Sequence, residues 1–168
     1  MLELGSQTGQ LYRLLDEVSR RLHNFLASAK TLVDHSRVHV LTTHSGTQFE
    51  KDYKDEVASR FSQSSITKFV HCLRNYNLHY RIPLVNASTR LEPGGQVTEM
   101  RQQIFLRADI LRSWTGWDKL AKRYLSEAGE QLSVERLATD YMRVVSPFYE
   151  WFRARDLQLH RSNVQNAQ

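Results

Sequence analysis

Apolar residues recur at steps of three and four along the first part of the chain. They are Leu11, Leu14, Leu15, Val18, Leu22, Phe25, Leu26, Ala29, Leu32 and Val33. This period places side chains on one side of an α-helix. We therefore expect one long amphipathic helix that starts near Gln10 and ends in the region 36–45, before Gly46.

Two shorter helices are predicted to follow the first one. Thr47 and Glu50 have the spacing of a capping box, in which each side chain accepts a hydrogen bond from the backbone N–H of the other residue. Apolar residues then recur at every fourth position, at Phe49, Tyr53, Val57 and Phe61. Ser64 or Ser65 can cap a third helix, which we expect from about Ile66 to Tyr80.

A β-hairpin is predicted over about residues 84–106. Small or apolar residues alternate with others after Pro83, and Pro93–Gly95 is a turn sequence. The segment from Val97 to Leu106 is rich enough in apolar and β-branched residues to pair back on the first arm. Because a lone hairpin is not stable, we expect it to pack against the helices.

Two more helices are predicted after the hairpin. Thr115 can cap the first of them, with Asp118 three residues later, and the last helix should start near Ser133. The last helix has an apolar stripe of Leu137, Tyr141, Val144, Val145, Phe148, Trp151 and Phe152. Pro147 falls inside this stripe and should kink or divide the helix.

These patterns predict a mainly α protein, a bundle of about five helices with one β-hairpin. The chain has no Gly/Pro-rich linker and no internal repeat, so we expect a single domain over residues 1–168. The ordered core should span about residues 8–158, with a frayed tail from Leu159 onward.

The amino-acid composition favours a protein that binds nucleic acid. The formal net charge is +5, and seventeen of the 23 basic residues are Arg, which binds phosphate with two parallel hydrogen bonds and stacks on bases. Acidic residues are scattered through the same segments, so much of this charge can also solvate helix surfaces. The lone Cys72, the absence of a secretory signal at the start and the lack of a long apolar run predict a cytoplasmic protein without a membrane span.

The third predicted helix separates its residues into two faces. At about 100° per residue, one side gathers Ile66, Phe69, Val70, Leu73, Tyr76 and Tyr80. The opposite side gathers His71, Arg74, Asn75, Leu78 and His79. We expect Arg74 and His79 to share one broad face, with Asn75 one turn before His79. The apolar Leu78 within this polar arc indicates that another subunit covers the face.

The segment Arg74–His79, with the sequence RNYNLH, resembles the Arg-x4-6-His motif of the HEPN superfamily (higher eukaryotes and prokaryotes nucleotide-binding). A polar residue commonly follows the Arg in that family, as Asn75 does here. The stretch Phe69–Pro83 is also similar to segments of uncharacterised bacterial helical proteins. HEPN proteins are small helical bundles that often dimerise. Many are RNA-cleaving toxins or phage-defence effectors, and others bind nucleotides or have lost activity.

The resemblance implies a metal-independent endoribonuclease that uses no cofactor and acts as a homodimer. Its partners would be RNA and, for a toxin, an antitoxin or other protein. His79 would transfer protons, because the unperturbed histidine pKa lies near neutrality. Arg74 would stabilise the charge on the phosphoryl oxygens. Asn75 would orient His79 or hydrogen-bond the substrate, and His71, a turn earlier on the same arc, would be a second proton-transfer group.

The same residues allow a non-catalytic interpretation. Arg74 and Asn75 can form a polar network between helices, and the helix dipole alone favours a cation such as His79 at a helix C-terminus. The alternative function is therefore a helical module that binds a partner protein or nucleic acid through this face. RNA cleavage that depends on His79 separates the two hypotheses.

Other candidate groups are assigned structural roles. His35, His39 and His44 have no carboxylate or Cys partner at ligand spacing except Asp34, so we expect solvated histidines rather than a metal site. Cys72 should be a buried free thiol. The aromatic side chains that could stack bases are expected to belong to the core or to a turn, namely Trp114, Trp117, Phe148, Trp151 and Phe152.

Overall fold

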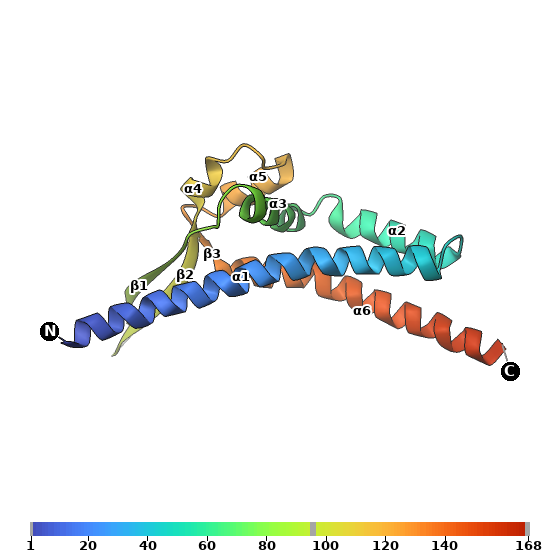
Figure 1. Ribbon diagram of the computed structural model, residues 1–168, viewed down its shortest axis with the longest axis horizontal. Coiled ribbons are helices and arrows are strands. Elements are labelled where there is room, and N and C mark those ends of the chain that lie inside the picture. Colours follow the sequence, from blue (N-terminus) through green and yellow to red (C-terminus); the bar gives the residue numbers. More distant parts are fainter. Residues whose placement is uncertain (1, 95–96, 167–168) are drawn as a thin grey trace.

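Two long helices form the axis of the molecule (Figure 1). The computed structural model describes the backbone of residues 2–94 and 97–166, and the side chains of residues 8–89 and 102–161. Its helices are α1 (Leu2–Thr43), α2 (Gln48–Phe61), α3 (Ser65–His79), α4 (Ala108–Arg112), α5 (Lys119–Glu127) and α6 (Val134–Asn166). Helices α1 and α6 lie side by side and run in the same direction. The mainly α prediction is confirmed.

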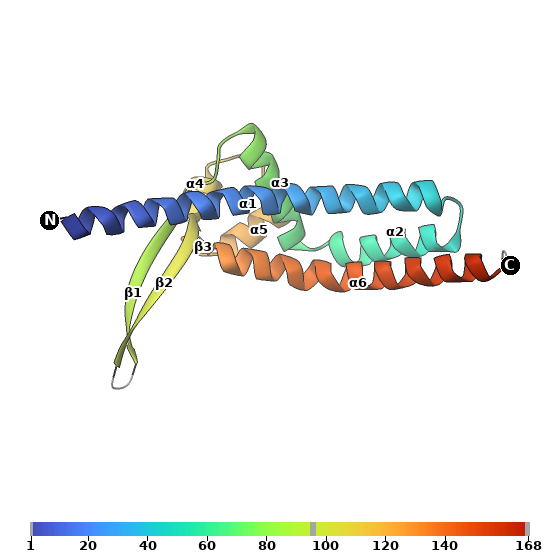
Figure 2. The same ribbon diagram turned by 60° about the horizontal axis from the view of Figure 1, so that its bottom comes forward.

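The shorter helices pack on this pair. Helix α2 lies along the C-terminal parts of α1 and α6, and α3 crosses α1 at a steep angle (Figure 2). The arms of the predicted hairpin are β1 (Val85–Gly94) and β2 (Val97–Arg107), antiparallel with Val85 opposite Leu106. Strand β1 contacts α1 and strand β2 contacts α6, while the far end of the hairpin extends away from both helices (Figure 2). Gly95 of the predicted turn lies outside the described residues.

A short third strand completes the sheet. Strand β3 (Gln131–Ser133) pairs antiparallel with β2 through the contact of Leu132 with Leu106. The sequence did not predict β3, because three residues are too few to show an alternating pattern. Both leucines are buried, so this strand joins the hairpin to the core.

The starts of α2 and α5 are capped by side chains. Thr47 accepts a hydrogen bond from the backbone N of Glu50 at 3.4 Å, as predicted. The reciprocal bond of the capping box is displaced by one residue, because Glu50 Oε2 accepts from the backbone N of Gly46 at 2.7 Å. Helix α5 begins after Asp118, whose Oδ1 accepts from the backbone N of Ala121 at 2.7 Å. The prediction of Thr115 as the N-cap is therefore wrong.

The last helix is longer than predicted. Helix α6 starts directly after Ser133, in agreement with the sequence, and Ser133 Oγ accepts from the backbone N of Arg136 at 3.2 Å. It continues through Pro147 without division and reaches Asn166, past Leu159, where the sequence predicts that a frayed tail begins. Proline removes one helical hydrogen bond, and packing of the apolar stripe on α1 and α2 offsets that loss.

The buried side chains form two clusters. The larger core joins α1, α3, α5, α6 and the base of the sheet around Phe69, Leu73 and Tyr76. The smaller one, here called the aromatic end cluster, lies where α1, α2 and α6 meet. Its buried members are Val40, Phe49, Tyr53 and Phe148, with Trp151, Phe152 and Leu159 partly buried against them. The core side of α3 is as predicted except at Tyr80, which is 56% exposed because the helix ends before it.

Candidate functional site

Helix α3 is fixed in place by its cap and by its buried side. Ser64 Oγ accepts a hydrogen bond from the backbone N of Thr67 at 3.4 Å, which satisfies one of the free N–H groups of the first turn. Phe69 and Tyr76 are completely buried, and their rings contact Trp117 at centroid distances of 5.0 and 5.9 Å. This anchoring turns the opposite stripe of α3, with His71 and Arg74, toward α1.

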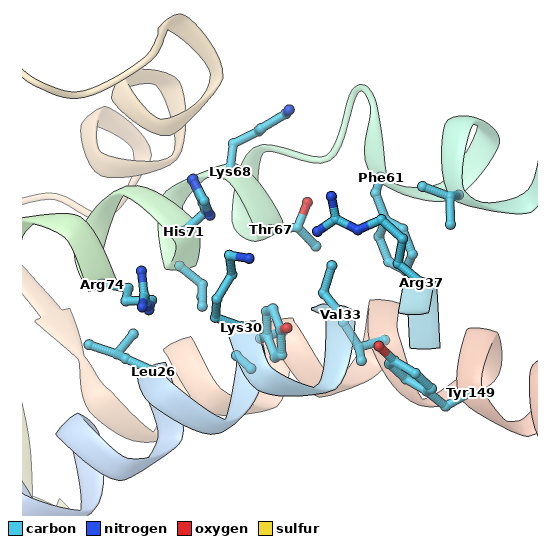
Figure 3. A pocket seen from close by; sticks show the side chains of 15 residues that line it. Leu26, Lys30, Val33, Arg37, Phe61, Thr67, Lys68, His71, Arg74 and Tyr149 are labelled. Carbon is cyan, nitrogen blue, oxygen red and sulfur yellow. The ribbon is translucent and has the colours of Figure 1, made fainter. Parts of the chain in front are cut away.

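A pocket of about 290 Å³ lies between α1, α3, α6 and the end of α2. Its apolar lining comes from Leu26, Ala29, Val33, Val57, Phe61, Val70 and Val145, with Tyr141 and Tyr149 from α6. Its polar lining comes from Lys30, Arg37, Thr67, Lys68, His71 and Arg74. Figure 3 shows Lys30 and Arg37 on the α1 side of the pocket and His71 and Arg74 on the α3 side, while Lys68 points away from α1. We call this the Arg74 pocket.

Arg74 has an unsatisfied donor within this pocket. Its Nε is buried and has no hydrogen-bond partner among the residues that the structure describes. Leaving a buried donor without a partner costs about 1–3 kcal/mol, and more when the group is charged. An anion bound in the pocket would supply the missing acceptor, and the planar guanidinium matches the oxygens of a phosphate.

The two cations from α1 share one acidic partner. Lys30 and Arg37 both bind the carboxylate of Asp34, and the Arg37 contact measures 2.6 Å. The hydrogen bond from Lys30 is the main cause that lowers the pKa of Asp34. Asp34 is not among the residues that line the pocket. The pocket thus carries an excess of positive charge, which attracts anions.

The pKa of His71 is lowered by burial and by these positive charges. Partial burial of its ring lowers the pKa of His71 below its usual value, and the nearby cations Lys30, Arg74 and Lys68 lower it further. Asp118, at the start of α5, acts in the opposite direction. The cations therefore disfavour protonation of His71 in the free protein.

The structure separates two of the residues that the sequence grouped together. Arg74 and His71 line the pocket, but His79 does not. His79 is the last residue of α3 and is exposed. Asn75 is half-buried one turn before His79, and Leu78 is 45% exposed. Five helical steps rotate the direction of the side chain by about 140°, so Arg74 and His79 leave α3 on different sides of its polar face.

The sequence did not single out Lys30, Arg37 and Lys68. Lys30 and Arg37 are seven residues apart and so share one face of α1, yet nothing in the local pattern identifies α3 as the helix that packs opposite them. Only the pairing of α1 with α3 brings these cations beside Arg74. A second link between these helices is the hydrogen bond between Asn77 Nδ2 and His23 Nδ1 at 2.8 Å.

The other candidate groups are now located. Cys72 is buried, as predicted, and burial raises the pKa of its thiol. Trp117 is buried, as its predicted role in packing requires, and its Nε1 donates to Leu111 O at 2.7 Å. His35 is exposed as predicted, but His44 is only 7% exposed, so its assignment as a solvated residue is wrong. The aromatic end cluster covers the His44 ring.

No family model, curated protein or solved structure matches this chain. The likeness of Arg74–His79 to the HEPN motif therefore stays a prediction. Among the described residues, no helix combines the length and the apolar character needed to cross a membrane.

Proposed function

We propose that this protein is a metal-independent ribonuclease that holds an RNA phosphate in the Arg74 pocket. The observation that carries the proposal is the buried Nε of Arg74, which has no partner in the described part of the chain and lies in a pocket lined by several cations. Every RNA linkage has one negatively charged phosphate, so this chemistry fits the backbone of RNA. The apolar and tyrosine lining beside the cations gives a base or ribose a surface to pack on.

The cleavage step needs no group outside the RNA except acids, bases and a charge stabiliser. The ribose 2′-oxygen attacks the adjacent phosphorus as its proton passes to a general base, and the bond to the 5′-oxygen breaks with return of a proton. The products are a 2′,3′-cyclic phosphate and a free 5′-hydroxyl end. We assign proton transfer to His79, charge stabilisation to Arg74 and orientation of His79 to Asn75. His71 contributes to phosphate binding.

A homodimer is part of the proposal, because His79 lies outside the pocket of its own chain. The end of α3 and the segment after it expose apolar side chains, with Leu78 45%, Tyr80 56%, Ile82 67% and Leu84 54% exposed. A second copy that covers this surface would bury Leu78, and in the proposed dimer the His79 of one copy acts on the phosphate held in the Arg74 pocket of the other. Homodimer interfaces are more apolar than the rest of a protein surface.

A non-catalytic module that binds RNA through the same pocket is the second candidate. The position of His79 outside the pocket favours it. Arg74, Lys30 and Arg37 would then bind phosphate without cleaving the RNA chain, and His79 would have no role in chemistry.

RNA cleavage in the presence of EDTA tests the proposal. We expect the wild type to produce cyclic-phosphate ends and His79→Ala to abolish cleavage. His71→Ala should weaken RNA binding, while the exposed His35→Ala should behave as the wild type. Light scattering on the same samples should give the mass of two chains. If varied RNAs remain intact with the wild type but still bind to it, the non-catalytic module is correct.

RNA binding should strengthen as the pH falls from about 7 toward 5, where histidine takes up its proton. In the free protein, burial and the neighbouring cations lower the pKa of His71. A bound phosphate opposes those cations and raises this pKa, so binding is accompanied by proton uptake. Linkage limits the gain to tenfold per pH unit. Fluorescence anisotropy with a short RNA measures it, since phosphodiesters do not titrate in this range.

The matched variants for this measurement are His71→Gln and His35→Gln. Replacement of His71 should flatten the pH dependence, while replacement of the exposed His35 should leave it as in the wild type. A pH dependence that persists in His71→Gln would assign the proton uptake to another group.

A further inference from the structure

A cluster of two histidines and one aspartate joins the end of α1 to α6. His39 Nε2 and His44 Nε2 lie 2.9 and 2.7 Å from the same oxygen, Oδ1 of Asp156. The ligand atoms of the three side chains all lie within 4.8 Å of one another. We propose that this histidine–aspartate cluster is a binding site for a divalent transition-metal ion of the Zn²⁺ class.

The end of α1 explains how both histidines reach one point. On a continuous helix, residues five apart diverge by about 140°, but α1 ends at Thr43, before His44. The backbone carbonyl of His44 accepts hydrogen bonds from the backbone N and the Oγ1 of Thr47 at 3.1 and 2.7 Å. Gly46 has a φ of 75°, which permits the tight turn into α2. The turn therefore holds His44 in a fixed position.

Aromatic side chains fix both imidazole rings. The His44 ring contacts Phe49 edge to face at a centroid distance of 4.8 Å, and the His39 ring contacts Phe152 in the same manner at 6.1 Å. His44 is buried, while the side chains of His39 and Asp156 are 42% and 29% exposed. The cluster is thus packed against apolar rings on one side and open to solvent on the other. Such a shell orients ligands before the metal binds.

The donor set selects the kind of ion. Imidazole nitrogen suits Zn²⁺, Co²⁺, Ni²⁺ and Fe²⁺, whereas Mg²⁺ and Ca²⁺ prefer oxygen ligands throughout. At metal–ligand distances of about 2.0–2.1 Å, tetrahedral ligand atoms stand about 3.3 Å apart. The two His–Asp pairs, now at 2.7 and 2.9 Å, need to separate by about half an ångström, and the two histidine nitrogens, which lie within 4.8 Å of each other, need to reach the same spacing. The metal binds each ring as the neutral imidazole, with the ring proton on Nδ1 and the Nε2 lone pair directed at the ion.

Three protein ligands leave one coordination position free for water on the exposed side. The bound ion would connect α1, the turn after it and α6, and would stabilise the folded protein by a free energy that rises with the logarithm of the ion concentration above Kd. None of the three ligands lines the Arg74 pocket. The metal site is therefore independent of the proposed ribonuclease activity. That activity is assayed in EDTA, which removes the metal, so the two tests can fail separately.

Titration of the full chain, freed of metal by EDTA and then desalted, tests this site. Calorimetry with Zn²⁺ should give one ion per chain, and Co²⁺ should give the visible absorption of a tetrahedral complex. Asp156→Asn and His39→Asn should each lower the Zn²⁺ affinity by about 100-fold or more, because even the loss of an outer-shell partner costs 10–100-fold. Both positions are partly exposed, and circular dichroism checks the fold.

His35→Asn is the matched control, since His35 lies one turn before His39 on α1 and is exposed. Its Zn²⁺ affinity should equal that of the wild type. The proposal is overturned if the wild type fails to bind one Zn²⁺ ion, or if Asp156→Asn binds as tightly as the wild type. It is also overturned if His35→Asn loses as much affinity as His39→Asn, because the ion would then sit on the exposed histidine pair of α1.

Discussion

Replacing Arg74 with alanine is expected to lower the rate of RNA cleavage by about two to three orders of magnitude, the usual cost of removing one donor that stabilises a developing oxyanion. Arg74 combines a full positive charge with a buried Nε that has no partner among the described residues. Arg74→Lys should recover only part of the rate, because an ammonium keeps the charge but loses the planar fork.

The control for this change is Arg123→Ala. Arg123 is an exposed residue of α5 that pairs with Glu127 at 3.6 Å and does not line the Arg74 pocket. Its removal should leave the rate unchanged. Single-turnover cleavage with saturating protein measures the chemical step. If Arg74→Ala cleaves RNA at the wild-type rate, Arg74 has no role in charge stabilisation. The same conclusion follows if Arg123→Ala lowers the cleavage rate as much as Arg74→Ala does.

A stability measurement distinguishes this role of Arg74 from a structural one. A polar network that holds α3 in place would lose stability when Arg74 is removed. An unpartnered buried donor instead destabilises the fold. The free energy of unfolding of Arg74→Ala should therefore equal or slightly exceed that of the wild type, although its cleavage rate is far lower. Chemical denaturation followed by circular dichroism provides the comparison.

The elements that the sequence predicted are those with strong local patterns. The three- and four-residue steps of α1 and α6, the serine cap of α3 and the alternation of the hairpin all reflect interactions between residues close in sequence. Helix α4 has five residues and β3 has three, so neither shows a period. The side chains of Thr115 and Asp118 can both accept the hydrogen bond of a helix N-cap. The packing of Trp117 against Phe69 and Tyr76 places the start of α5 at Asp118.

The candidate sites depend on contacts between distant parts of the chain. The sequence identified Arg74 and His71 because they share one helix, but it could not show that Lys30 and Arg37 lie opposite them. It also gave His39 and His44 no carboxylate partner other than Asp34, because Asp156 lies more than a hundred positions further along the chain. The packing of α1 on α3 and on α6 is set by the buried face of each helix. A helical wheel identifies that face but not the helix that packs against it.

The largest loss of stability is expected for Phe69→Ala, at about 3–5 kcal/mol. Phe69 is completely buried, stacks on Trp117 at 5.0 Å and contacts the ring of Tyr124 at the same centroid distance. Its removal leaves a cavity between α3 and α5, which rigid aromatic rings cannot fill. Leu78→Ala, on the exposed side of α3, is the matched control and should change stability by less than about 0.5 kcal/mol in the monomer.

Urea denaturation of both variants measures the difference. A loss of unfolding free energy below about 1 kcal/mol for Phe69→Ala is no larger than that of an average substitution. It would mean that the α3–α5 contact does not anchor α3. The expected loss has a functional consequence, because α3 carries His71 and Arg74 on the side opposite Phe69. If that anchoring positions the pocket, Phe69→Ala should weaken RNA binding even at temperatures where circular dichroism shows it to be fully folded. Leu78→Ala should leave phosphate binding in the pocket unchanged.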